Sequence, residues 1–319
     1  MSKYVKDAID SQIKSTGVMD AGDGVFFERE LEHIKAKSYD KKYADLKFRE
    51  VFPISHDAPE GSTSITVRSY DKVGVAKIIN GYATDLPRVD IAGKEYSVLV
   101  KQTGASYGYT TKEIRSSRLT GKSLEQRRAN TVNRANEELL NKIAYNGDAD
   151  NGLFGLFTVG GIPTTTVATK AAGGTKWINN ATPEEILFDM NNAVAVQVET
   201  TKMKEAPTRG LMPVAQYQYI ASKARSANSD TTILEYFLQN NQYVKEVMPL
   251  NELNGAGTAG VDVFVIYNPD PDNLVFEMPM EFRHNPPQLR GLSWDIPCES
   301  ETGGLNVYYP LSIAIWEGI

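Results

Sequence analysis

Apolar and polar residues alternate with a period of two in two stretches within residues 51–110. This period is typical of strands with one half-buried face, so the pattern predicts two strands. The segment between them has a glycine at each end, and we expect a long two-stranded ribbon with its tip near residues 81–93. An isolated two-stranded ribbon is marginally stable in water, so another element must hold it, and that element need not lie in the same chain. The apolar positions are Ile65, Val67, Tyr96, Val98 and Val100.

The clearest helical pattern follows Ser123. Ser123 and Gln126 have the capping-box spacing, in which each side chain binds a free backbone N–H group of the first turn. Apolar side chains then recur every three or four residues up to Gly147, which predicts one helix over residues 124–146, about 35 Å long. We expect other elements to pack against the narrow apolar stripe of this long helix. The stripe is Val132, Ala135, Leu139 and Ile143, widened by Leu140 and Ala144.

The second half of the chain predicts a mixed body. Thr182, Pro183 and Glu185 combine an N-cap, a proline at the first helical position and an acid at the third, so a helix begins there. The order of elements, without an internal repeat, is typical of the α+β class. Further helices are expected over residues 213–225 and 232–239, and strands over residues 261–267, 274–278 and 306–315.

Residues 1–50 form a charged N-terminal arm with ten basic and ten acidic residues. Its helical pattern over residues 26–46 has only a thin apolar face at Phe27, Leu31 and Ile34. Such a segment buries little surface against its own chain. We therefore expect either a solvated surface helix or an arm laid across a neighbouring subunit.

Composition narrows the function classes. The 319 residues are enough to bury about three quarters of the unfolded surface. The formal net charge of −6 argues against a dedicated nucleic-acid binder, and the single cysteine, Cys298, excludes an intrachain disulfide and a Cys-ligated metal cluster. No apolar run approaches the roughly 18 residues of a membrane span, and the N-terminus is too polar for a signal peptide. We expect a soluble protein of the cytosol, or one assembled there.

One motif has the form of a hydrolase nucleophile. Residues 104–108 (GASYG) match G-x-S-x-G between a predicted strand and a predicted helix over residues 112–119, which is the context of a nucleophile elbow. The catalytic triad would need an acid and then a histidine downstream, and the only later histidine is His284. Repeated βαβ units are also missing. We therefore predict a turn here and reject a hydrolase that uses Ser106.

The other candidate motifs are incomplete. Residues 121–123 (GKS) end like a phosphate-binding loop but lack its first glycine, and residues 146–150 alternate like a calcium loop but lack its glycine and its closing glutamate. The three histidines have no metal-ligand spacing. We predict no catalytic residue, no metal site and no cofactor. The histidines are His33, His56 and His284.

Several segments together resemble the major capsid proteins of tailed bacteriophages, in the branch that shares the HK97-like shell fold. The order and spacing of these segments carry the resemblance, which covers nearly the whole chain from about Gly24 onward. The segments are residues 26–32 (FFERELE), 83–90 (ATDLPRVD), 106–115 (SYGYTTKEIR), 146–148 (NGD), 152–156 (GLFGL), 302–305 (TGGL) and 308–310 (YYP).

The resemblance implies an α+β HK97-like capsid fold in which the ribbon is an extended loop and the long helix is a spine. The implied parts are an N-terminal arm (1–50), the extended loop and its lead-in (51–122), a peripheral domain (123–180) with the spine helix 124–146, an axial domain (181–280) and a return to the peripheral domain (281–319).

The implied function is structural. The protein would assemble in the host cytoplasm into the icosahedral shell of a virion that encloses phage double-stranded DNA, without sequence-specific binding and without a membrane. Its partners would be copies of itself, as pentamers and hexamers, with scaffolding, portal or decoration proteins. An encapsulin-like nanocompartment shell stays open as an alternative, and the Ser106 hydrolase is a distant one.

The expected subunit interface lies on the arm and the extended loop. Some members of the family cross-link a lysine of this loop to an asparagine of a neighbour, but nothing marks a reacting pair around Lys77 or Lys94. The residues expected at the interface are Phe27, Asp85, Leu86, Arg88, Asp90 and Lys94.

Overall fold

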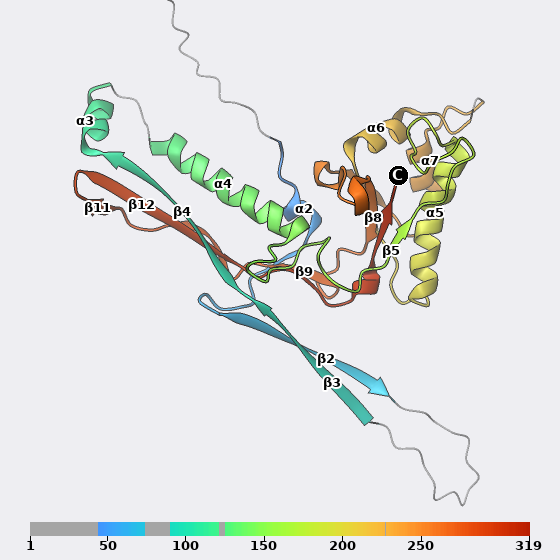
Figure 1. Cartoon of the computed structure of the whole chain (residues 1–319), viewed down its shortest axis with the longest axis horizontal. Helices are drawn as coiled ribbons and strands as arrows, with labels where there is room; N and C mark the ends of the chain where they lie inside the picture. Colours follow the sequence, from blue (N-terminus) through green and yellow to red (C-terminus); the bar gives the residue numbers. More distant parts are fainter. Residues whose placement is uncertain (1–43, 74–89, 121–124, 227) are drawn as a thin grey trace, which may run out of the picture. The chain divides into compact units, whose positions relative to one another are not determined.

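A computed structural model describes residues 44–73, 90–120, 125–226 and 228–319 (Figure 1). Contacts divide the chain between Asp45 and Leu46, a few residues before the end predicted for the arm at residue 50. The reason is the short helix α2 (Phe48–Val51), because Phe48 and Val51 are fully buried in the main core. The helical pattern predicted over residues 26–46 lies almost entirely outside the described residues.

The predicted two-stranded ribbon is confirmed. Strand β2 (Ser64–Val73) pairs antiparallel with β3 (Asp90–Leu99) over their whole length. Among the strands that the structure describes, these two pair only with each other. Because β3 begins at Asp90, residues 90–93 are strand residues and not part of the tip as predicted. The rest of the predicted tip, residues 81–89, lies outside the described residues.

A four-stranded sheet continues from the ribbon. After the single residue Val100, β4 (Lys101–Thr110) pairs along its whole length with β12 (Ser293–Thr302). The other edge of β12 pairs with β10 (Met280–His284) and β11 (Gln288–Arg290).

The GASYG motif lies in the middle of β4, where Ser106 is opposite Pro297. Both the predicted turn and the nucleophile elbow are therefore wrong. The segment stays extended because β12 supplies a partner residue for each of its positions, and glycine and serine leave no apolar alternation that would reveal a strand.

Helices α3 (Thr111–Thr120) and α4 (Glu125–Asn146) follow β4 and confirm two of the predicted helices. Helix α4 packs against β4, but its buried stripe differs from the prediction because Leu139 is exposed and Asn136 is buried. The Asn136 Oδ1 atom accepts hydrogen bonds from Thr103 Oγ1 (3.1 Å) and Ser300 Oγ (3.0 Å). Hydrophobic periodicity does not detect a polar contact of this kind.

A five-stranded sheet forms the second body. Its central strand β8 is buried on both faces, since Phe264 and Ile266 join one apolar cluster and Val263, Val265 and Tyr267 join another. In sheet order, the strands are β5 (Thr164–Thr166), β14 (Ile313–Glu317), β8 (Val263–Tyr267), β6 (Arg209–Met212) and β7 (Glu246–Pro249).

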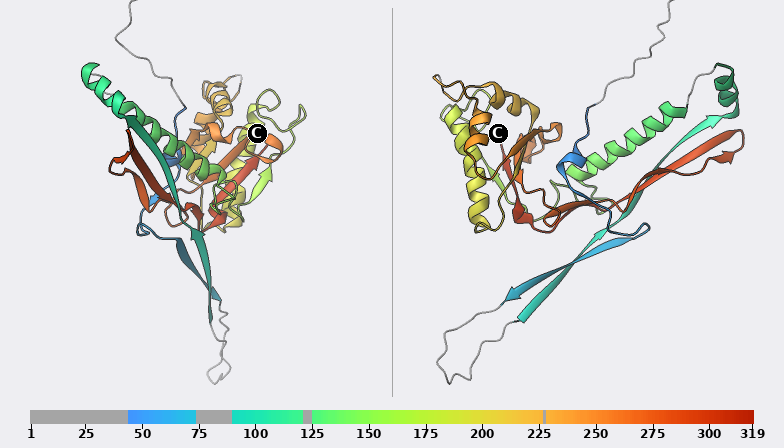
Figure 2. Two further views of the ribbon diagram at one scale, coloured as in Figure 1. Left: turned by 60° about the vertical axis from the view of Figure 1, so that its left-hand side comes forward. Right: turned by 180° about the vertical axis from the view of Figure 1, so that it is seen from behind.

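Three helices cover the Phe264 face of this sheet (Figures 1 and 2). They are α5 (Pro183–Thr200), α6 (Val214–Ser222) and α7 (Ile233–Asn240), close to the predicted ranges. Thr182 and Glu185 form the predicted capping box of α5. Among the described residues, no helix combines the length and the apolar character of a membrane span.

A small sheet completes the described residues. Strand β9 (Leu274–Glu277) lies between β1 (Ile54–Ser55) and β13 (Gly304–Val307). The 3₁₀ helices η1 (Asn251–Leu253) and η2 (Thr258–Gly260) lie in the connection from β7 to β8.

The single strand predicted over residues 306–315 is two strands in two different sheets. The 3₁₀ helix η3 (Pro310–Ser312) separates β13 from β14, because Pro310 has no N–H group to continue a ladder. Strand β14 then joins the five-stranded sheet, so the last residues belong with strands from the predicted axial range 181–280.

Candidate assembly surface

Most residues predicted at the subunit interface lie outside the described part of the chain. Asp90 is the first residue of β3, opposite Val73, and Lys94 is exposed in β3, opposite Ser69. The structure places both on the ribbon, as expected, but with no further predicted residue beside them. Phe27, Asp85, Leu86, Arg88 and the candidate cross-linking Lys77 are outside the described residues.

Each of the two described histidines contacts another group of the fold through its Nδ1 atom. The Nδ1 atom of His56 is 2.6 Å from the Met278 carbonyl oxygen, and the Nδ1 atom of His284 is 3.0 Å from Cys298 Sγ. Burial raises the pKa of the Cys298 thiol, which keeps it protonated. No group of three or more metal-ligating side chains occurs among the described residues.

The loop that has part of a calcium-loop pattern, and for which no metal site was predicted, is closed by its own hydrogen bonds. The Asp148 carboxylate accepts a hydrogen bond from Asn151 Nδ2 at 2.7 Å, which lowers the pKa of Asp148. Asp148 also pairs with Leu153 in a short bridge. The alternation of residues 146–150 is therefore explained by a turn.

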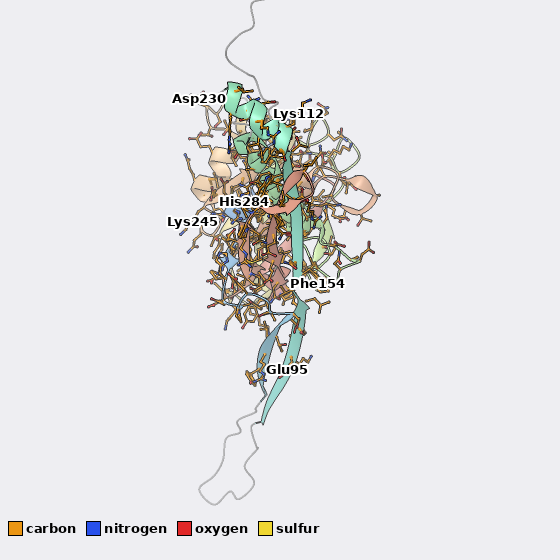
Figure 3. All side chains as sticks on the ribbon, turned by 90° about the vertical axis from the view of Figure 1, so that its left-hand side faces the viewer. Glu95, Lys112, Phe154, Asp230, Lys245 and His284 are labelled. Carbon is orange, nitrogen blue, oxygen red and sulfur yellow. The ribbon has the colours of Figure 1, made fainter. Side chains whose placement is uncertain are left out.

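The ribbon carries an exposed aromatic side chain on each face, because Tyr70 and Tyr96 are three register positions apart. Tyr70 of β2 is 64% exposed and Tyr96 of β3 is 56% exposed. The Tyr70 ring lies over Gly93, where an added Cβ would be 3.3 Å from Tyr70 Cε1. Arg68 Nε is 2.8 Å from Glu95 Oε1, but both side chains are exposed, and such pairs contribute only about 0.2–1 kcal/mol. Figure 3 shows Glu95 on the ribbon, apart from most other side chains.

The base of the ribbon is anchored, in contrast to its outer part. The Val100 N–H group donates to the Thr63 carbonyl oxygen at 3.0 Å, and the Gly61 N–H group donates to Glu301 Oε2 at 2.9 Å. Arg283 pairs with Glu60 at 2.9 Å in the same lead-in segment. Within its own chain, the described ribbon is therefore anchored at its base and not at its outer end.

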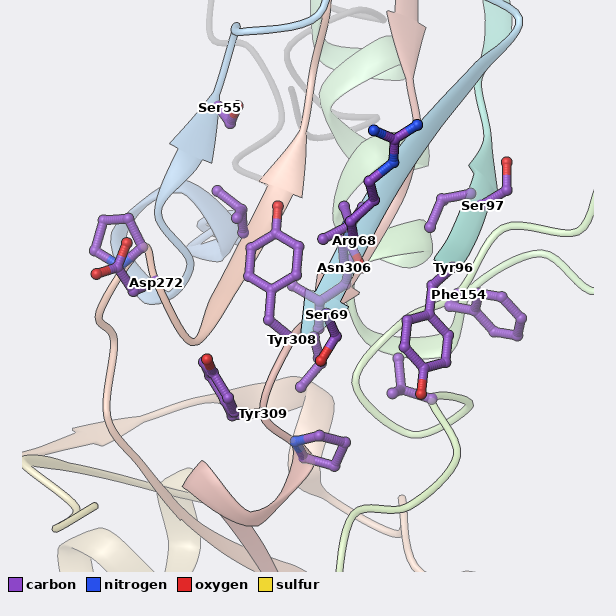
Figure 4. A pocket seen from close by; sticks show the side chains of 18 of the residues that line it. Ser55, Arg68, Ser69, Tyr96, Ser97, Phe154, Asp272, Asn306, Tyr308 and Tyr309 are labelled. Carbon is purple, nitrogen blue, oxygen red and sulfur yellow. The ribbon is translucent and has the colours of Figure 1, made fainter. Parts of the chain in front are cut away.

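A groove of about 1390 Å³ runs beside the ribbon (Figure 4). Strands β2 and β3 line one side, and Phe154 and the segment after β13 line the other. Tyr309 and Phe154 are exposed in it, as are Asp57 and Asp272. A groove larger than the usual 300–1,000 Å³ of a small-molecule pocket, with aromatic walls, fits a protein segment better than a substrate.

One buried acid lies behind the groove wall, in contact with Tyr308, which lines the groove. Glu277 accepts a hydrogen bond from Tyr308 Oη at 3.1 Å, and burial raises the pKa of Glu277. Burial also raises the pKa of Tyr308. This hydrogen bond ties β9 to the segment just after β13 and gives the buried carboxyl group a partner.

Comparison with known proteins identifies the family. The family described as "Major capsid protein" matches residues 74–319. The chain belongs to the major capsid protein family. A comparison with proteins of curated function gives no match.

Solved capsid structures show the same fold as this major capsid protein. The capsid of Myoviridae Phage XM1 aligns with a TM-score of 0.79 and 17% identity over 93% of this chain and 99% of that chain. The capsid of an empty GTA particle has a TM-score of 0.63 and 11% identity, over 93% and 99%. The chain from Mycobacterium phage Bobi has a TM-score of 0.59 and 10% identity, over 91% and 96%.

These matches confirm the predicted α+β, HK97-like capsid fold and the assignment to tailed-phage major capsid proteins. Members are structural, non-enzymatic components of the virion shell, which is built from copies of the subunit, so the Ser106 hydrolase alternative is wrong. Sequence reasoning missed the groove, since its walls come from strands far apart in the chain. It also took Tyr96 as half-buried, because periodicity identifies a strand face but not whether the same chain covers it.

Proposed function

We propose that the ribbon is an extended loop that packs on a neighbouring subunit of an icosahedral phage capsid. In this proposal, pentamers and hexamers of the protein enclose double-stranded DNA that is held without sequence-specific contacts. The net charge of −6 agrees with a shell that does not bind DNA tightly.

The observation that carries the proposal is the ribbon's lack of internal support. Strands β2 and β3 pair with no other described strand, and Tyr70 and Tyr96 stay exposed beside the groove. Two strands alone are marginal in water, and exposed apolar patches commonly mark contact surfaces. Neighbouring copies on both faces of the ribbon would supply the missing support and cover both tyrosines, which lie on opposite faces.

The domain roles are part of the same proposal. Residues 123–180 and the strands after residue 280 up to β13 would form the peripheral domain around α4. Residues 181–280, joined by β5 and β14, would form the axial domain around the five-fold and six-fold positions. Scaffolding, portal or decoration proteins would bind the assembled shell or its precursor.

The test measures assembly of the wild-type chain and of a Tyr70→Ser/Tyr96→Ser variant. Gradient sedimentation and negative-stain electron microscopy should show closed shells, or rings of five and six, for the wild type. The variant should keep its circular dichroism spectrum, since both rings are exposed, and lose most of its assembly. Equal assembly of the wild type and the variant would show that the two tyrosines of the ribbon are not part of the subunit interface.

Two further outcomes are informative. A stable 35.2 kDa monomer, even with a candidate scaffold from a neighbouring gene, would contradict self-assembly. Packaged nucleic acid in particles purified from infected cells supports the phage capsid, whereas an enclosed enzyme would support a nanocompartment shell.

A further inference from the structure

The helix layer over the five-stranded sheet has two open ends. Helix α7 contacts both α5 and α6. Helix α5 contacts β14, near the β5 edge of the sheet, and α6 contacts β7, the strand at the opposite edge. The body therefore has an α5 end and an α6 end (Figure 1). The side chains at the two ends differ in chemistry.

Helix α5 is acidic around one aromatic side chain, while the exposed Lys202 and Lys204 lie just beyond its last residue. Phe188 is 64% exposed, although its neighbours Leu187 and Met190 are buried in the layer. Helical periodicity places Glu184 and Glu199 on the same exposed face as Phe188. Neither glutamate has an ion-pair partner among the described residues, and α5 contains no lysine or arginine.

Towards the end of α5, Phe188 is followed on this face by short side chains. Ala195 lies two turns further along the helix and Asn192 lies one turn further, both between Phe188 and Glu199. A partner can therefore approach the phenyl ring closely. The result is an aromatic anchor with a carboxylate on each side.

The α6 end is basic and partly apolar. Helix α6 contains no acidic residue, and Val214 at its start is exposed. The Lys223 Nζ atom lies 4.5 Å from the centre of the Tyr219 ring. Lys245, just before β7, is exposed and has no ion-pair partner in the described part of the chain (Figure 3).

We infer that the α5 end of one subunit docks against the α6 end of the next copy, with Phe188 as the central anchor. Glu184 and Glu199 then lie opposite Lys223 and Lys245. This inference rests on the proposed assembly function and names one of its contacts.

A head-to-tail contact follows from the charges. Two α5 ends would bring four carboxylates together, and two α6 ends would bring lysines together, so contacts between like ends are disfavoured. Contacts between unlike ends repeat with one rotation per subunit and close into a ring when the rotation fits. A buried aromatic side chain near the centre is the kind of residue that dominates interface energy.

The test is a charge exchange between the two ends. Glu184→Lys/Glu199→Lys and Lys223→Glu/Lys245→Glu should each lower the yield of rings and shells at least tenfold, at a subunit concentration where the wild type assembles. The quadruple variant restores opposite charges and should recover at least half of the wild-type yield. Phe188→Ser should lower the yield in both charge backgrounds.

Each result has one meaning. If either two-residue variant assembles like the wild type, the contact is wrong, while the proposed assembly function stands. If both variants fail and the quadruple variant also fails, with unchanged circular dichroism and thermal midpoints, the two ends do not face each other. Failure of the wild type itself under all conditions contradicts the assembly function instead.

Discussion

Lys170 and Asp189 form an ion pair inside the helix layer, with side-chain exposures of 2% and 5%. The Trp177 Nε1 group also donates to Asp189 Oδ2 at 2.8 Å, so one carboxylate holds two donors from the loop that precedes α5. A buried charge that loses its partner is costly because it keeps its desolvation penalty. This loop therefore depends on one carboxylate.

Asp189→Ala should lower the free energy of unfolding by about 3–5 kcal/mol, because it leaves the Lys170 ammonium group buried without a counter-charge. Urea denaturation of the unassembled subunit measures the change. The matched control is Lys170→Met/Asp189→Ala, which buries no charge and should lose clearly less. The explanation fails if the single variant is as stable as the double variant.

A second residue-scale prediction concerns pH. The Arg128 guanidinium donates to Glu113 at 2.8 Å and lowers the pKa of Glu113 to about 2. A carboxyl group with a pKa below its unfolded value of 4.5 stabilises the fold above pH 4.5, and this contribution is lost as the pH falls towards 2.

Arg128→Gln should therefore raise the pKa of Glu113 towards 4.5, as followed by NMR titration of the side-chain carboxyl carbon. Arg118→Gln is the control. Arg118 lies on helix α3, as Glu113 does, and forms no described ion pair with Glu113. A wild-type Glu113 that already titrates at 4.5 would show that the Arg128 contact does not form in solution.

At the scale of elements, a helix or strand could be predicted when the residues that determine it lie within one stretch of sequence. The ribbon strands, α4 and the capping box of α5 have their signals within one stretch of sequence, and each was predicted correctly. Strand β4 was missed, because its extended state depends on β12, nearly two hundred residues away. The division of the tail depended on Pro310, whose effect an apolar alternation does not show.

The end of α4 offers an element-scale test. An added Cβ at Gly155 would lie 2.3 Å from the Gly147 nitrogen and 2.4 Å from the Ile143 carbonyl oxygen. Backbone atoms cannot move aside easily, so Gly155→Ala should destabilise the subunit by about 3 kcal/mol. Thermal or urea unfolding measures this loss.

Gly160→Ala is the matched control, because an added Cβ there meets no atom within 4 Å. It should change the free energy of unfolding by less than about 0.5 kcal/mol. Similar values for the two variants would mean that the loop after α4 is not packed as described.

At the scale of the whole molecule, sequence alone established the family resemblance but not the contact surfaces. The charged arm and loop tip were expected to form the interface, and most of those residues lie outside the described part of the chain. The groove and the two ends of the helix layer each combine residues from separate elements. Such surfaces exist only after folding, so no sequence motif marks them.

Salt separates the charged part of the proposed ring contact from its apolar part. The Debye length falls from about 8 Å at 0.15 M ionic strength to about 3 Å at 1 M. In 1 M sodium chloride, the assembly defect of Glu184→Lys/Glu199→Lys should shrink, while that of Phe188→Ser should persist. Sedimentation at both salt concentrations measures this, and equal salt responses would contradict the assigned roles.

The path of the chain from β3 to β4 has a mechanical consequence. Only Val100 separates the strand of the ribbon from the strand on which α4 packs. A neighbouring subunit that pushes or twists the ribbon therefore transmits the force to the β4–β12 pair through one nearly continuous backbone. Val100 joins the two strands and is buried. The ribbon therefore has little freedom to change its angle unless the sheet that α4 covers rotates with it.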